Sequence, residues 1–273
     1  MVTSRTPSSA SMTRFLIFSY VFTLMCLLLG SPYLLFKVAQ RVKGSLRSIL
    51  QGTMFGIGSQ FLLELILAFV VYTSLRAGFS LRAWPDSLLL PAVLYALLIE
   101  ALRALAVSRF ATHVRSARAA AHFGLGWGCG IAIFLGVQLL VTLYAHQNFD
   151  PLESLGAYPQ EVRQELSLEL ERERTELLEA SPLRPPLQHV LKAGLNAFFQ
   201  LAFTLILVGT WTRGERFAWL RAAAFHAGLR LLATVPLLYV PGWGGLLLSL
   251  GLQFLLVAPT YRWMARQIVQ SAR

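Results

Sequence analysis

Apolar runs separated by short polar segments follow one another along nearly the whole chain. Seven of these runs are long enough to cross a bilayer, because about 20 apolar residues in an α-helix span its hydrocarbon core. The runs cover residues 15–36, 49–75, 88–107, 123–145, 189–211, 217–235 and 243–259. The pattern predicts an all-α fold, a polytopic transmembrane helix bundle with about seven spanning helices.

The polar segments divide the chain further. Segment 146–188 holds nine of the 13 acidic residues, with Pro159 placed for the first turn of a helix and Pro182 for its end. We therefore expect one extramembrane amphipathic helix between the fourth and fifth spans, which either connects them or docks a basic partner. The divisions are a polar N-terminal tail (1–14), spans one to four (15–145), an acidic helical loop (146–188), spans five to seven (189–260) and a basic C-terminal tail (261–273).

Composition agrees with a membrane protein and excludes a soluble domain. Hydrophobic residues make up 56% of the chain, charged residues 14%, and the mean hydropathy is +0.59. The net charge of +11 comes mostly from basic residues in short loops beside the apolar runs, where they orient helices and meet anionic headgroups. We expect the lipid bilayer as partner and no nucleic acid. Both cysteines lie inside apolar runs, so neither a metal cluster nor a disulfide framework is indicated, and no cofactor is expected.

Basic residues are distributed unequally between alternate short loops. Twelve Lys and Arg fall on one side of the predicted bundle and four on the other. Because basic loops stay in the cytoplasm, we expect an integral protein of a bacterial cytoplasmic (inner) membrane. Its N-terminus and acidic loop should lie outside, and its C-terminus inside.

Two charged residues interrupt the third run. Glu100 and Arg103 lie one helical turn apart, and a charge near a bilayer centre costs about 2.5–3.5 kcal/mol on insertion scales. Such residues face protein or water and are functional-site hypotheses. The alternative is that the two neutralise each other within one helix.

Small and polar residues recur at every fourth position on four of the predicted helices, a pattern typical of helix–helix interfaces in membranes. The stripes are Gly52, Gly56, Gln60 and Glu64; Ala92, Ala96, Glu100 and Ala104; Asn196, Gln200 and Thr204; and Ala222, His226, Arg230 and Thr234. Glu100, Gln200 and His226 each lie near the middle of a run, so we expect them to meet at one depth in a polar cavity. His226 also fits a hydrogen-bonded core histidine, and Arg230 fits a side chain that extends to the outer surface.

Glycines open the fourth run, at positions 124, 126, 128 and 130. They form no phosphate-binding loop, since no strand precedes them. The spacing of four between Gly124 and Gly128, and between Gly126 and Gly130, instead predicts close approach of another helix.

From Lys43 to Leu232 the chain resembles the YhfC-type branch of the CPBP (Abi/CAAX-processing-like) intramembrane proteases. Three segments carry the resemblance: 44–64, with Ser59 and Gln60; 99–103, of sequence Ile-Glu-Ala-Leu-Arg; and 123–132, of sequence Phe-Gly-Leu-Gly-Trp-Gly-Cys-Gly-Ile-Ala. The family has two adjacent glutamates and an arginine at the second segment, and a glycine-rich string with a histidine and a glutamate at the third.

The chain departs from the family at chemically important positions. Ile99 replaces the first glutamate, Trp127 a histidine, Ile131 a glutamate, and Gln200 stands near the place of a further histidine. The matching residues are Glu100, Arg103 and His226. The resemblance implies that these three supply base, charge stabilisation and acid, and too few ligands remain for a metal site. The residues expected to line the cavity are Gln60, Glu64, Gln200, Asn196 and Trp127.

Two classes of function remain open. One is a glutamic-type intramembrane endopeptidase that acts on membrane-anchored segments, or a non-catalytic relative that binds such a protein. The other is a permease-like or accessory transport subunit with a charged intramembrane cavity. Transporters often contain internal repeats, and this sequence shows none, which favours the protease-like class.

Overall fold

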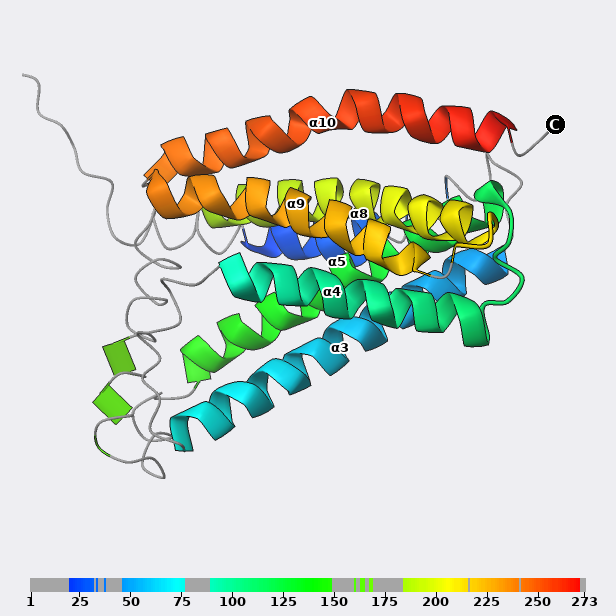
Figure 1. The fold of residues 1–273 in the computed structure, drawn as a ribbon. Coiled ribbons are helices and arrows are strands. Elements are labelled where there is room, and N and C mark those ends of the chain that lie inside the picture. The colour runs from blue at the N-terminus through cyan, green and yellow to red at the C-terminus, as the bar shows by residue number, and fades with distance from the viewer. Residues whose placement is uncertain are drawn as a thin grey trace, which may run out of the picture. The chain divides into compact units, whose positions relative to one another are not determined.

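In the computed structural model, all secondary structure in the described residues is helical. The described ranges are 20–31, 46–76, 89–148, 184–215, 217–240 and 242–270, together with residues 33, 37, 160, 163, 164, 167 and 168. Six α-helices account for most of them (Figure 1): α3 (Leu46–Arg76), α4 (Leu89–Leu105), α5 (Ala117–Asn148), α8 (Arg184–Trp211), α9 (Ala218–Tyr239) and α10 (Gly242–Gln270). Two π-helical turns, η1 (Cys26–Gly30) and η4 (Ala106–Phe110), complete the order.

Five of the described helices are long and apolar enough to cross a membrane, which makes this an integral membrane protein. The spans are Leu46–Val70, Ala117–Val141, Val190–Trp211, Ala218–Tyr239 and Trp243–Ile268. The predicted count of seven is not confirmed. The third predicted span forms α4, which has 17 residues and then widens into the π-helical turn η4. The first predicted span, residues 15–36, lies partly outside the described residues. Its described part includes a shorter apolar helix, Tyr20–Gly30.

Most of the described helices extend beyond the apolar runs that predict them, and α8, α9 and α10 are examples. α8 begins at Arg184, inside the segment predicted to be the acidic loop, and α9 continues through Pro236 to Tyr239. α10 continues through Pro259 to Gln270, where the sequence predicts a basic tail after residue 260. A proline removes one helical hydrogen bond but does not always end a helix, and Met264 beyond it is buried. The predicted amphipathic helix at 159–182 lies outside the described residues except for five helical positions.

The chain divides into two compact units. In the first, residues 1–30 and 135–190, Tyr20 and Leu139 are buried against each other and Leu24 packs against them. The second, residues 31–134 and 191–273, contains α3, α4, α9 and α10 with most of α5 and α8, and it holds the buried polar residues of the candidate site described below.

Glycines bring α5 against two neighbours in the second unit. A Cβ added at Gly126 or Gly130 would overlap the carbonyl oxygens of Ile49 and Thr53 on α3. On the α8 side of α5, a Cβ at Gly124 would come within 2.7 Å of the Leu201 Cα. The alternate glycines therefore face different helices, and the predicted close approach is confirmed for both pairs.

On α3, Gly52 and Gly56 meet the backbone of Phe123 and Trp127 in the same way. The contact between α3 and α5 therefore has small residues on both sides. Helices in lipid associate through such close packing, because lipid tails are as apolar as the side chains and give little hydrophobic driving force.

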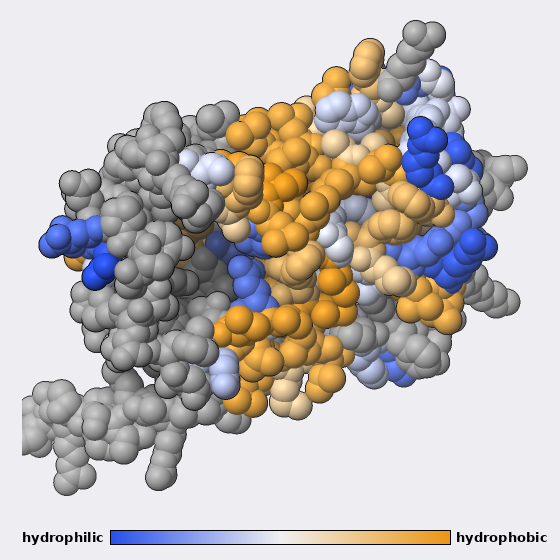
Figure 2. Space-filling view, turned by 90° about the horizontal axis from the view of Figure 1, so that it is seen from below, coloured by the Kyte–Doolittle hydropathy of each residue, from blue (hydrophilic) through white to orange (hydrophobic). Residues whose placement is uncertain are grey.

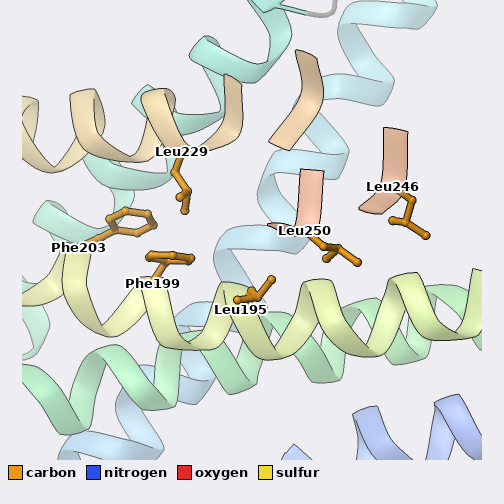
Figure 3. Close-up of a cluster of buried hydrophobic side chains, with 6 residues drawn as sticks. All are labelled: Leu195, Phe199, Phe203, Leu229, Leu246 and Leu250. Atoms are coloured by element: carbon orange, nitrogen blue, oxygen red, sulfur yellow. The ribbon is translucent and has the colours of Figure 1, made fainter. Parts of the chain in front are cut away.

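An apolar cluster joins α8, α9 and α10. Figure 3 shows its six buried members, with Phe199 and Phe203 on α8 directed toward Leu229 on α9: Leu195, Phe199, Phe203, Leu229, Leu246 and Leu250. α9 also packs along the whole of α4 (Figure 1). This second contact carries the buried charges.

Basic residues gather at one end of the second unit, where α3 and α5 begin and η4 and α8 end (Figure 1). The Ser48 hydroxyl lies 3.0 Å from Nε2 of His113, and the Arg115 guanidinium lies 5.2 Å from the Trp211 ring centroid. Figure 2 shows a largely apolar band with hydrophilic residues on both sides of it, and the larger group of them lies at one end. The exposed arginines of the unit include Arg47, Arg109, Arg115, Arg118, Arg213 and Arg221.

Candidate functional site

A buried ion pair lies within α4. Glu100 and Arg103 are completely buried, and Nη1 of Arg103 lies 3.3 Å from Oε2 of Glu100. Their spacing of three residues places both side chains on one face of the helix. Because α9 packs along α4, this face points into protein rather than lipid.

His226 on α9 completes the contact between the two helices. Its Nδ1 lies 2.8 Å from Oε1 of Glu100. An ionised carboxylate only accepts hydrogen bonds, so Nδ1 carries the hydrogen and donates it. The imidazole stacks on Phe203 at a centroid distance of 4.3 Å, and Tyr95 meets its edge. These aromatic contacts fix the ring orientation and with it the direction of the hydrogen bond.

Arg103 extends from α4 to α8. It donates to the side-chain oxygen of Gln200 and, over 3.3 Å, to the Gln200 carbonyl. Gln200 in turn donates to Oδ1 of Asn196 over 2.8 Å. The guanidinium also lies 4.9 Å from the Trp127 ring centroid, at a distance where a cation is attracted to an aromatic face. Arg103 therefore links three helices around one positive charge.

We call Glu100, Arg103, Gln200 and His226 the polar cluster. All four are buried, with exposed fractions of 0% to 2%. Three buried polar atoms in and beside it have no hydrogen-bond partner: Oε2 of Glu100, Nε of Arg103 and Nε1 of Trp127. Oε2 still belongs to the ion pair with Arg103, so the two donors are the atoms left without any partner, whereas buried polar groups in proteins are normally paired.

A second polar group adjoins the cluster. The Gln60 amide on α3 donates to the hydroxyl of Tyr95 on α4. The Arg230 guanidinium on α9 lies 3.4 Å from the centroid of the Tyr95 ring. Arg230 therefore packs on an aromatic ring of the neighbouring helix and is partly exposed, and its extension to the outer surface stays a prediction.

The predicted site residues fall into three groups. The structure brings Glu100, Arg103, His226, Gln200, Asn196 and Trp127 together, and it joins Gln60 to their surroundings through Tyr95. Glu64 is half-buried on α3, and no described hydrogen bond or ion pair joins it to the polar cluster. Tyr95 and Phe203 complete the surroundings and were not predicted, because an aromatic residue inside an apolar run carries no sequence signal of its own.

The polar cluster has the composition of an acid–base site rather than a metal centre. Among the described residues, no group of three or more His, Cys, Asp or Glu side chains could hold a metal ion. The cluster instead holds one carboxylate, one imidazole and one guanidinium in direct contact. Such groups exchange protons, orient a polar molecule or stabilise a developing negative charge.

Comparison of the chain with protein-family models, with curated proteins and with solved structures finds no match.

Proposed function

We propose that the polar cluster is the active site of a glutamic-type intramembrane endopeptidase that acts on membrane-anchored polypeptide segments. The observation that carries the proposal is a buried carboxylate beside two buried donors without a hydrogen-bond partner, Nε of Arg103 and Nε1 of Trp127. Hydrolysis needs an acceptor for a water proton and donors for the oxyanion, and this set supplies both kinds.

The residues then take the following roles. Glu100 accepts a proton from water as the water oxygen bonds to the peptide carbonyl carbon. Arg103 and the Trp127 indole N–H stabilise the negative charge on the carbonyl oxygen. When the carbon–nitrogen bond breaks, Glu100 returns its proton to the leaving nitrogen. His226 orients the carboxylate through its hydrogen bond to Oε1.

The substitution Glu100→Gln tests this function. The amide is nearly isosteric and still accepts the hydrogen bond from His226, but it does not take a proton from water at neutral pH. We expect the variant to accumulate in membranes while cleavage is lost. Membrane-protein fragments from wild-type, deletion and Glu100→Gln cells are compared by mass spectrometry, with Glu215→Gln, a loop carboxylate paired with Arg221, as the control.

Three results are informative. Fragments present in wild-type and Glu215→Gln cells but absent from the other two strains support the peptidase. The same fragments in all strains contradict it and leave the non-catalytic binding and transport functions. Chelators should not change the pattern, because one histidine and one carboxylate fall short of the three protein ligands usual for catalytic zinc.

We propose further that the basic end faces the cytoplasm of a bacterial cell, with the N-terminus outside and the C-terminus inside. The arginines at the start of α3 and α5 and at the end of η4 and α8 support this orientation, because basic loops are retained in the cytoplasm. Reporter fusions at Ser116 and Ser167 should report opposite sides, with Ser116 cytoplasmic. Both reporters on one side would contradict the proposed topology.

A further inference from the structure

Arg230 is a positive charge within a membrane span that has no acidic partner among the described residues. Its described contact is with Tyr95, whose ring centroid lies 3.4 Å from the guanidinium carbon. The described ion pairs engage Arg103, Arg213, Arg221 and His226, and Arg230 is absent from them. A charge in a low-dielectric region is costly unless it is paired.

The neighbouring cluster does not supply the missing charge. Glu100 already contacts Arg103 and His226. With His226 neutral, the sum over Glu100, Arg103 and Arg230 is one net positive charge. A single anion would balance it.

The position of Arg230 limits what that anion is. It lies 12 residues after the start of α9 and nine before its end, or about 18 Å and 14 Å along the axis by the rise of 1.5 Å per residue. This depth is inside the hydrocarbon region rather than at the headgroups. A phosphate monoester would bring a charge of about −1.5 to −2, more than the site needs.

We infer that Arg230 and Tyr95 form a binding site for the carboxylate of a lipid-soluble ligand. The guanidinium presents a planar fork of donors that matches a carboxylate. Tyr95 covers one face of that plane and is itself held by the amide of Gln60. The Arg230 side chain is half-buried, so a ligand reaches it from outside the bundle.

A photoreactive long-chain fatty acid and its methyl ester test the inference on the full-length protein in lipid nanodiscs. We expect the acid to label the protein and the ester to label it at least tenfold less, because a charge-assisted pair is lost. Peptide mapping should place the label on α4 and α9. Equal labelling by acid and ester overturns the inference, and this comparison needs no variant.

Substitutions then assign the site to Arg230. Arg230→Gln should reduce labelling by the acid about tenfold. Arg221→Gln, an exposed arginine on the same helix, should leave it unchanged. Arg230→Lys keeps the charge without the planar fork, and it should reduce labelling severalfold even if Arg230→Gln does not fold. Labelling that is the same in wild type and Arg230→Lys contradicts the assignment.

Competition identifies the source of the carboxylate. A hydrophobic peptide with a free C-terminus should displace the labelled acid if the site takes polypeptide carboxylates, and the same peptide with a C-terminal amide should not. Displacement by both peptides alike would contradict recognition of the carboxylate. Glu100→Gln removes a negative charge near the site and should be labelled at least as strongly as wild type, whereas the proposed peptidase activity should be lost, so the two proposals are tested separately.

Discussion

Two helix contacts in the second unit are built in opposite ways. α3, α5 and α8 meet through glycines that bring one backbone against another, as at Gly56 and Gly126. α4 and α9 meet through large polar side chains, as at Glu100 and His226. The first contact depends on the absence of side-chain atoms, whereas the second depends on the pairing of Glu100 with Arg103 and His226. Substitutions should therefore affect the two contacts through different mechanisms.

The largest effect is expected at the polar contact. Arg103→Met leaves Glu100 buried without its cation, and removing one member of a buried pair costs about 3–5 kcal/mol. Unfolding of the purified protein in mixed micelles, followed by helix content, measures the loss. We expect the midpoint to fall markedly below that of wild type.

A double substitution separates the pair from the packing around it. Glu100→Leu with Arg103→Met removes both charges, so it should recover much of the stability that Arg103→Met loses. If the double variant is no more stable than the single one, the two charges are not coupled, and the polar contact differs less from the glycine contact than the structure indicates.

An intermediate effect is expected at the glycine contact. Gly126→Ala adds a Cβ that overlaps the carbonyl oxygen of Ile49, and overpacking costs about 1–3 kcal/mol. Gly58→Ala is the matched control, since nothing lies within 4 Å of its added Cβ. Alanine favours a helix over glycine by roughly 1 kcal/mol, so the Gly58→Ala control should be more stable than wild type. Stabilisation of both variants would show that the helices are not in backbone contact.

The smallest effect concerns the basic end. Burial, together with the nearby Arg47 charge, lowers the pKa of His113 below its usual value of 6.5. The neutral imidazole is thus favoured in the folded protein, and its contribution to stability is present above pH 6.5 and lost as the pH falls through the lowered pKa. The midpoint of thermal unfolding should be lower at about pH 5.5 than at about pH 7.5.

Two variants test whether His113 causes this decrease in the thermal midpoint. His113→Gln should reduce it because the group that titrates is gone, and Arg47→Gln should reduce it partly because the repulsion is gone. The contact with Ser48 ties His113 to the start of α3, next to the glycine contact. A drop that is unchanged in His113→Gln would assign it to another group.

Much of the fold follows from the sequence because apolar runs of spanning length have few alternatives to a helix in lipid. The spacing of Gly126 and Gly130 also identifies a helix contact, since small residues at a spacing of four share one face. Helix ends are harder to predict. α10 continues past Pro259 because packing around Met264 is a tertiary effect that the local sequence does not reveal. α4 widens into η4, and no residue in that turn signals a π-helix.

The polar contacts are predictable in part. Glu100 and His226 stand out because charged and polar residues are rare in apolar runs, and their stripes place them at similar depth. The partners of Arg230 are not predictable in this way. Tyr95 is one aromatic among many, and its contacts with both Gln60 and Arg230 depend on how three helices are packed. The members of the polar cluster can therefore be predicted because polar residues are rare in apolar runs, whereas the residues around the cluster depend on helix packing.

The ion pair within α4 has a consequence for biosynthesis. His226 lies 126 residues after Glu100 in the chain, so at ribosomal rates of about 5–20 residues per second it is made on the order of 10 s later. For most of that interval α4 has neither its histidine nor Gln200, which is made 26 residues before His226. Arg103, three residues from Glu100 on the same helix, is the one member of the cluster already present. It serves as the provisional counterion that lets a nascent segment with a carboxylate enter the bilayer before the rest of the bundle exists.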